Sequence, residues 1–144
     1  MAILDTSKKP YIQDRNTDVF VGIDYPVNRS EGPAGWFSGT ETTIDAVKTN
    51  IRLLMSTEKG ERLMQPNLGL SLRRYLFEQF TDDLAIGVQN EILNTIKFWM
   101  PFVEVRDIQV SMSDANSNTM KIQVMFNITK SPNTLESIEI EIGD

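Results

Sequence analysis

The apolar residues in the middle of the chain fall into three groups with helical spacing. Ser71 and Thr81 stand directly before the second and third groups, where a helix N-cap is expected. Thr42 or Thr43 begins the first group, and Pro101 ends the third, because the residue before a proline avoids the helical conformation. The groups are Ile44, Val47, Ile51 and Leu54; Leu72, Tyr75 and Leu76; and Leu84, Val88, Ile92 and Ile96. This pattern predicts three helices.

After Pro101 the spacing of apolar residues changes to two, the period of a β-strand. The alternation slips at Arg106–Asp107, which predicts a β-bulge. Residues 114–118 and 131–134 are rich in turn formers and predict the connections between strands. The alternating runs are Val103 to Met112; Met120, Ile122, Val124, Phe126 and Ile128; and Ser137, Ile138, Glu139, Ile140, Glu141 and Ile142. They predict a small three-stranded antiparallel sheet.

Residues 1–41 follow neither pattern and are rich in turn signals, apart from Val19–Val21, which is typical of a short strand. We expect an irregular N-terminal arm, either a poorly ordered tail or a segment that lies on a neighbour. Trp36 and Phe37 are the residues expected to pack on that neighbour. Residues 42–144 then form a single domain of the α+β class, with three helices followed by a small three-stranded antiparallel sheet.

Charge and composition exclude several classes of function. The 144 residues include 14 Lys and Arg against 20 Asp and Glu, a net charge of −6. Nucleic acids and membrane surfaces select clustered basic residues, so neither is expected as a partner. No apolar run is long enough to cross a bilayer. The chain has no histidine and no cysteine, so no Ser-His-Asp or Cys-His catalytic set can form. We expect no cofactor and no metal.

Acidic residues leave one enzymatic alternative open. Glu58 lies near Glu61 in the sequence, and Glu78 lies near Asp82 and Asp83. Two carboxylates can hydrolyse a glycosidic bond, so the alternative function is a carboxylate-dependent, lysozyme-like cell-wall hydrolase. In so acidic a chain such pairs also arise by chance, and a helix dipole favours acidic residues in the first turn. We therefore expect a protein that is not an enzyme.

Two stretches are candidates for binding another protein. Residues 99–102, Trp-Met-Pro-Phe, are the most hydrophobic junction of the chain, and such aromatics either pack in the core or anchor a partner. The last strand offers a sheet edge, whose unpaired backbone groups can pair with another chain. Glu139 and Glu141 either protect this edge against unwanted pairing or belong to an edge that receives a partner strand.

The stretch KGERLMQPNLGLSLRRYLF, residues 59–77, joins the first two predicted helices. Gly60 is expected to end the first helix as a C′ glycine with positive φ. Pro66 and residues 67–69, Asn-Leu-Gly, are expected to reverse the chain. The stretch lacks the pattern of a phosphate-binding loop, so we interpret it as a scaffold turn. Residues 73–74, both arginine, either meet an acidic partner or remain solvated.

Residues 53–79, LLMSTEKGERLMQPNLGLSLRRYLFEQ, resemble the signature of the phage baseplate wedge and tail sheath-initiator family. Members of this family also occur in the baseplates of type VI secretion and other contractile injection systems. The matching residues, in order, are Thr57, Gly60, Arg62, Pro66, Gly69, Leu76, Phe77 and Glu78. The resemblance extends from residue 44 to about 142, and it agrees with the layout of helices followed by strands.

The resemblance implies a structural role in a contractile tail. Such a protein would dock on other baseplate wedge proteins near the tail tube, with the tube or hub as further candidate partners. It would initiate the tail sheath by strand pairing between the edge at residues 137–142 and the first ring of sheath protein. It would be present in several copies, six by the symmetry of such tails. Its place would be the virion tail baseplate, assembled in the host cytoplasm.

The family carries a Glu-Pro-Arg tripeptide for contacts with the wedge partner, and WMPFVEVRDIQV, residues 99–110, stands at its place here. Pro101 matches, but Met100 and Phe102 replace the two charged residues. The resemblance therefore implies a wedge contact that is apolar or that borrows two nearby charges. The residues concerned are Trp99, Met100, Pro101, Phe102, Glu104 and Arg106.

Overall fold

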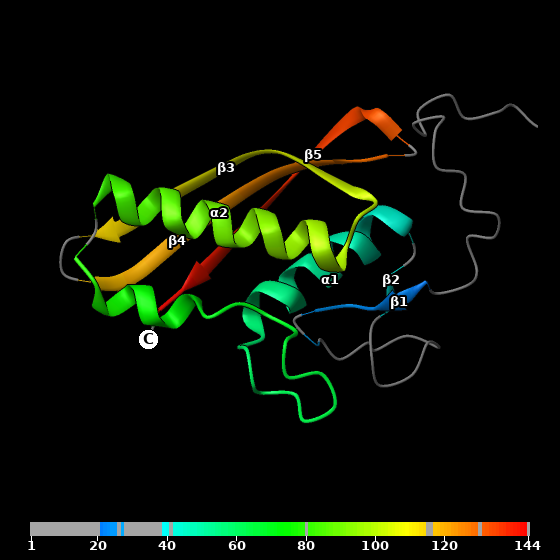
Figure 1. Cartoon of the computed structure of the whole chain (residues 1–144). Coiled ribbons are helices and arrows are strands. Elements are labelled where there is room, and N and C mark those ends of the chain that lie inside the picture. Colours follow the sequence, from blue (N-terminus) through cyan, green and yellow to red (C-terminus); the bar gives the residue numbers. More distant parts are fainter. Residues whose placement is uncertain are drawn as a thin grey trace, which may run out of the picture.

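The computed structural model of the chain describes residues 21–25, 27, 39–40, 42–79, 81–114, 117–129 and 131–143. Its helical elements are α1 (Thr43–Ser56), the 3-10 helix η1 (Leu72–Phe77) and α2 (Asp82–Trp99). Three long strands follow, β3 (Val103–Asp114), β4 (Ser117–Ile128) and β5 (Ser131–Ile142). Two short strands, β1 (Gly22–Ile23) and β2 (Gly39–Thr40), precede the helices (Figure 1).

The predicted mixture of helices and a three-stranded antiparallel sheet is confirmed, but two details of it are wrong. The middle helical element is a 3-10 helix rather than an α-helix. It is only six residues long, and its turns of three residues each place Leu72 and Tyr75 on the same side. Ser71 precedes it without a side-chain cap. A second sheet, in which β1 pairs with β2, lies before the helices. The predicted order of helices first and strands afterwards therefore holds only for residues 43–142.

Most of the predicted N-terminal arm lies outside the described residues, and so do Trp36 and Phe37. The described part of it is not irregular throughout. Gly22 pairs with Thr40, and Ile23 pairs with Gly39. Val21 donates a backbone hydrogen bond to the Thr40 carbonyl over 2.9 Å, so the strand predicted at residues 19–21 is found slightly later in the chain.

The two long helices begin where the sequence indicates, because threonine side chains cap them. The Thr42 hydroxyl oxygen accepts a hydrogen bond from the Asp45 backbone N–H (3.1 Å) and donates one to the Asp45 carboxylate (2.6 Å). The Thr81 hydroxyl accepts from the Leu84 N–H over 3.3 Å. Each cap satisfies a backbone donor that the first helical turn leaves unpaired.

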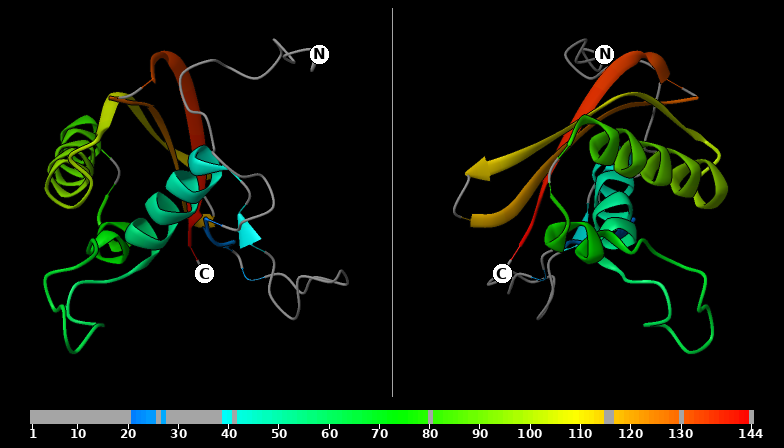
Figure 2. Two further views of the ribbon diagram at one scale, coloured as in Figure 1. Left: turned by 90° about the vertical axis from the view of Figure 1, so that its right-hand side faces the viewer. Right: turned by 60° about the vertical axis from the view of Figure 1, so that its left-hand side comes forward.

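The helices pack on one face of the sheet, whose strands lie in the order β3–β4–β5. α2 packs against β3, α1 contacts β5, and η1 contacts β4 (Figures 1 and 2). The covered side of β4 supplies the centre of the core, and each of its residues there is 1% exposed or less: Met120, Ile122, Val124 and Phe126. The other face of the sheet is polar. Neither α1 nor α2 is long and apolar enough to span a membrane, as judged over the described residues.

The strand register confirms the predicted bulge and corrects the predicted turns. Val105 pairs with Phe126 and Asp107 pairs with Met125, which leaves Arg106 as the extra residue. The turn predicted at residues 131–134 is wrong, because β5 begins at Ser131, which pairs with Ile128. The register of β4 and β5 shifts between Phe126 and Ile128, next to this pair. The loop predicted at 114–118 is shorter, since Asp114 pairs with Ser117.

Candidate partner-binding surfaces

The predicted last strand, β5, forms one edge of the sheet. Within the described residues it pairs only with β4, and seven consecutive pairs from Met120–Ile142 to Phe126–Glu136 keep a regular register. Ile138 is 1% exposed and faces the helices, whereas Ser137, Glu139 and Glu141 are exposed on the polar face. The far side of this regular strand is therefore a surface on which another strand can pair.

The opposite edge, formed by β3, is less suited to pairing. Its register is interrupted at Arg106 and again between Met112 and Asp114. In addition, the side-chain amide of Gln89 on α2 donates a hydrogen bond to the Ile108 carbonyl oxygen over 2.8 Å. Bulges and a covering helix are two devices by which proteins protect sheet edges. The two edges of one sheet thus differ: the register of β3 shifts twice and α2 bonds to it, whereas that of β5 shifts once, near its start, and is regular over residues 136–142.

The junction at residues 99–102 borders an apolar groove of about 350 Å³. Met100 is 6% exposed and forms part of its floor, while Phe102 is 45% exposed at its rim. Phe98 is 76% exposed and packs edge-on against Trp99, with ring centroids 5.2 Å apart. The opposite wall comes from α1 and the following loop, with Leu53, Leu54, Thr57, Arg62 and Leu68. The aromatic residues therefore serve both the core and an exposed surface.

The six predicted wedge-contact residues do not form one surface. Trp99, Met100 and Phe102 line the groove on the helix side, and Pro101 is exposed beside it. Glu104 and Arg106 lie on the polar face of the sheet, because strand alternation places Glu104 opposite to buried Val103.

Arg106 and Glu104 form a closed polar network with buried Asn127. The Arg106 guanidinium contacts the Glu104 carboxylate at 3.2 Å and donates to the Asn127 side-chain oxygen at 2.9 Å. The Asn127 amide donates in turn to Glu104 over 3.4 Å. These two charges already satisfy each other, so the apolar groove is the better candidate for docking.

The loop between α1 and η1 is shaped by close backbone approaches. The Leu70 N–H donates to the Thr57 carbonyl over 2.9 Å. Gly69 has a φ of +106°, and a Cβ at this position would lie 2.1 Å from the Thr57 carbonyl oxygen. The Thr57 hydroxyl donates to the Leu53 carbonyl over 2.7 Å. Thr57 and Gly69 of the family signature therefore hold the two ends of the loop together.

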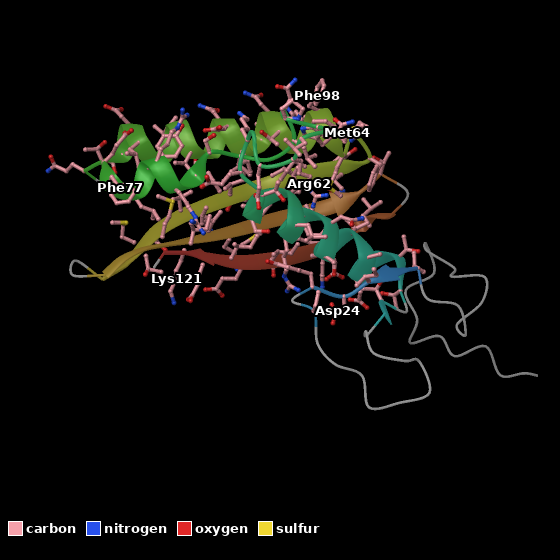
Figure 3. The ribbon with its side chains drawn as sticks, turned by 90° about the horizontal axis from the view of Figure 1, so that it is seen from below. Asp24, Arg62, Met64, Phe77, Phe98 and Lys121 are labelled. Carbon is pink, nitrogen blue, oxygen red and sulfur yellow. The ribbon has the colours of Figure 1, made fainter. Side chains whose placement is uncertain are left out.

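Gly60 does not end α1 as its C′ residue, which corrects the expectation. The helix ends at Ser56, and Thr57 follows in an extended conformation. Gly60 lies within the loop, where its φ of +90° lets its N–H donate to the Pro66 carbonyl over 2.8 Å. The tip of the loop is apolar and exposed, since Leu63 is 96% and Met64 92% exposed. Figure 3 shows Arg62 and Met64 on this loop.

A cluster around Glu91 ties the loop and η1 to α2, and sequence reasoning missed it. The Glu91 carboxylate accepts hydrogen bonds from the Tyr75 hydroxyl (2.8 Å), the Arg74 guanidinium (3.1 Å) and the Lys59 ammonium (3.1 Å). Burial alone raises the pKa of Glu91, but the hydrogen bonds of Tyr75 and Lys59 and the charges of Lys59 and Arg74 outweigh burial and lower it. Arg74 is therefore already paired within the chain, although its side chain is 59% exposed.

The other signature residues of η1 have different environments. Leu76 packs against the core, Phe77 is 82% exposed, and Glu78 is exposed. Phe77 lies at the far end of the helical layer from Phe98 (Figure 3). Neither Phe77 nor Glu78 borders the apolar groove.

The carboxylates of the hydrolase alternative do not gather around a described cleft. Glu58 faces Arg73 at 3.6 Å, and its backbone N–H donates to the Glu61 carboxylate. Glu61, Glu78 and residues 82–83 line neither this groove nor the smaller cavity beside β5. No cluster of acidic residues within the described chain could hold a metal ion.

A strand edge that pairs with no other described strand and an apolar groove with exposed aromatics are features of proteins that assemble with other proteins. The comparison with known families agrees with this class. Residues 41–133 match the family of the baseplate wedge protein gp25, and the chain belongs to that family. It is thus a structural baseplate component of a contractile tail or a related injection system, as the signature residues predicted.

Individual relatives support the same assignment. The baseplate wedge protein gp25 of Enterobacteria phage T4 is 23% identical over 98 residues, which cover 68% of this chain and 74% of the phage protein. A chain of the anti-feeding prophage baseplate is 25% identical, with a TM-score of 0.63 and coverage of 74% and 83% of the two chains.

A Geobacter sulfurreducens protein described as a tail lysozyme has the same fold. It is 20% identical, with a TM-score of 0.65, and the match covers 74% of this chain and 95% of that protein. At this identity the likeness concerns the fold alone.

Proposed function

We propose that this chain initiates the sheath of a contractile tail by receiving a strand of the first sheath ring along the free edge of β5. The observation that carries the proposal is the difference between the two edges of the sheet. β5 keeps seven regular pairs with β4 over residues 136–142 and shifts its register only before them, whereas β3 is bulged within its length and bound by Gln89. Strand addition provides both affinity and register through backbone hydrogen bonds, so it needs no catalytic residue.

The apolar groove beside Trp99 and Phe102 then attaches the chain to other wedge proteins near the tail tube. Phe98 and Phe102 are the large exposed side chains at this place, and aromatic anchors of this kind dominate protein interfaces. The groove and the β5 edge are formed by different elements, so both partners can bind at once. Six copies, assembled in the host cytoplasm, would form a ring that matches the sixfold symmetry used for the anti-feeding prophage baseplate.

The test uses the absence of cysteine from the chain. Ser137→Cys places one thiol at the β5 edge, and Ser111→Cys places one at the β3 edge, both at exposed positions. Each variant, labelled with a benzophenone maleimide, is assembled with the sheath and wedge proteins of the same tail and irradiated. We expect sheath adducts from Ser137→Cys and few from Ser111→Cys. Equal yields, or adducts from the β3 edge alone, would show that β5 is not the receiving edge.

A further inference from the structure

A cavity of about 140 Å³ opens beside the C-terminal end of β5. Ile140 and Ile142 form its strand side, on the face of the sheet that the helices cover. Met55, Leu70 and Leu72 form its base, and each is 2% exposed or less. Ser56, Glu58 and Arg73 line its open side, so the cavity has an apolar base and a polar rim. A volume of about 150 Å³ holds a benzene molecule, so this cavity has room for a single large side chain with its apolar end against the base.

One carboxylate oxygen at the rim of this cavity lacks a hydrogen bond. Glu58 Oε1 is buried and has no hydrogen-bond partner. The Arg73 Nε atom forms an ion pair with it at 3.6 Å, a distance beyond hydrogen-bond range, and the Glu58 side chain as a whole is 45% exposed. Buried polar atoms in folded proteins are nearly always paired. A donor group on a segment that enters the cavity would satisfy this oxygen.

The other face of the same strand is acidic. Glu139 and Glu141 are exposed there; on β4, Glu141 pairs with Lys121, whose ammonium lies 2.7 Å from its carboxylate, and Glu139 pairs with Gln123. Figure 3 shows Lys121 on this face of the sheet. Opposite charges on neighbouring strands stabilise pairing, and like charges oppose it. A strand that pairs with the outer side of β5 is therefore favoured when it carries lysine or arginine on this face.

We propose that the strand received by β5 has basic residues on one face and apolar residues on the other. This inference rests on the function proposed above. One large apolar side chain of this strand, leucine or phenylalanine, fills the cavity, and a neighbouring N–H or hydroxyl donates to Glu58. Because the side-chain period of a strand is two, a one-residue slip would turn the basic residues away from Glu139 and Glu141. A two-residue shift would keep the faces but move the large residue off the cavity. The cavity thus sets the register of the first sheath subunit.

The test adds matched variants to the Ser137→Cys photocrosslinking protein. Ile140→Trp fills the cavity, and Val110→Trp makes a similar change in the same cross-strand row on β3, since both residues pair with Ile122. Glu139→Lys reverses the charge on β5, and Gln109→Lys adds the same charge on β3, since both residues pair with Gln123. Sheath capture is measured as a function of sheath concentration, with thermal unfolding as the control for folding.

We expect Ile140→Trp and Glu139→Lys to raise the sheath concentration needed for half-maximal capture about tenfold or more, with the two β3 variants near the parent. Mass spectrometry of the adduct should identify a segment in which basic and apolar residues alternate. Normal capture by a folded Ile140→Trp protein, or a captured segment without basic residues, would overturn this inference and leave the proposed function standing. Failure of the parent protein to capture sheath would overturn the proposed function itself.

Discussion

At the scale of single residues, the glycines of this chain have separate tasks. Gly69 has a positive φ, and the Thr57 carbonyl oxygen lies close to where a Cβ of residue 69 would be. Gly60 has a positive φ but open space around it, and Gly87 lies in α2 with open space and no such φ. These differences arise from the tertiary environment, because the three residues are identical.

Alanine substitutions of these glycines should therefore have three different effects on the free energy of unfolding. Gly69→Ala should lower it by about 3 kcal/mol, because left-handed strain and a steric clash act together. Gly60→Ala should lower it by about 1–2 kcal/mol through strain alone. Gly87→Ala should raise it by about 0.5–1 kcal/mol, because alanine is the better helix former. Urea unfolding measures all three, and equal effects at positions 60 and 69 would contradict the role given to the Thr57 carbonyl.

Glu91 makes stability depend on pH in a defined direction. Its pKa in the folded protein is lowered from the ordinary value of 4.5. Folding therefore gains from the ionised carboxylate above the unfolded pKa, and this gain is lost as the pH falls through the lower folded pKa.

Glu91→Gln should consequently flatten the loss of stability below pH 4.5. At pH 7 it should lower the free energy of unfolding by about 1–3 kcal/mol, because Tyr75 and Lys59 lose a charged acceptor. Unfolding by urea at pH 7 and pH 3.5 measures both effects. If the free energy of unfolding changed with pH in the same way for the parent and the variant, the Glu91 cluster would not contribute to the pH dependence of stability. Glu78→Gln, which makes the same change at an exposed position outside this cluster, is the control.

At the scale of elements, helix caps separate the true α-helix from the short 3-10 helix. Thr81 bonds the Leu84 N–H, whereas Ser71 stands before η1 without any side-chain cap bond. Thr81→Ala should therefore lower the free energy of unfolding by about 1 kcal/mol. Ser71→Ala should leave it nearly unchanged. Thermal and urea unfolding of the two variants test this, and a large cost at Ser71 would mean that its hydroxyl has a structural role not explained by capping.

At the scale of the whole molecule, the groove and the strand edge are formed by different elements, and their functions should separate. Phe102→Ser removes an exposed rim aromatic of the groove, and Phe77→Ser removes one that is more exposed but lies on η1. We expect Phe102→Ser to weaken binding to the wedge complex about tenfold or more, as for a truncated aromatic anchor. Pull-down of each variant at a series of wedge-complex concentrations measures this binding. Equal binding of both variants would exclude the groove as the wedge contact.

The sequence alone predicted much of this architecture. Period-two and helical spacing of apolar residues identified the long helices and strands, because burial of one face imposes that spacing directly. Thr42 and Thr81 marked the helix starts, and the phase slip at Arg106 marked the bulge, since each is a short-range steric or hydrogen-bonding effect. The ordered signature from Thr57 to Glu78 identified the family that the comparison confirmed.

The tertiary structure decided which of these parts are available to a partner. The Glu91 cluster joins residues up to 32 positions apart, and the hydrogen bond of Gln89 to Ile108 joins helix and strand edge. No local pattern encodes such meetings, because they depend on how the elements pack. The sequence therefore determined the elements and the family. Packing determined that α2 bonds to β3, that no other described strand pairs with the outer edge of β5, and that a cavity lies beside its end.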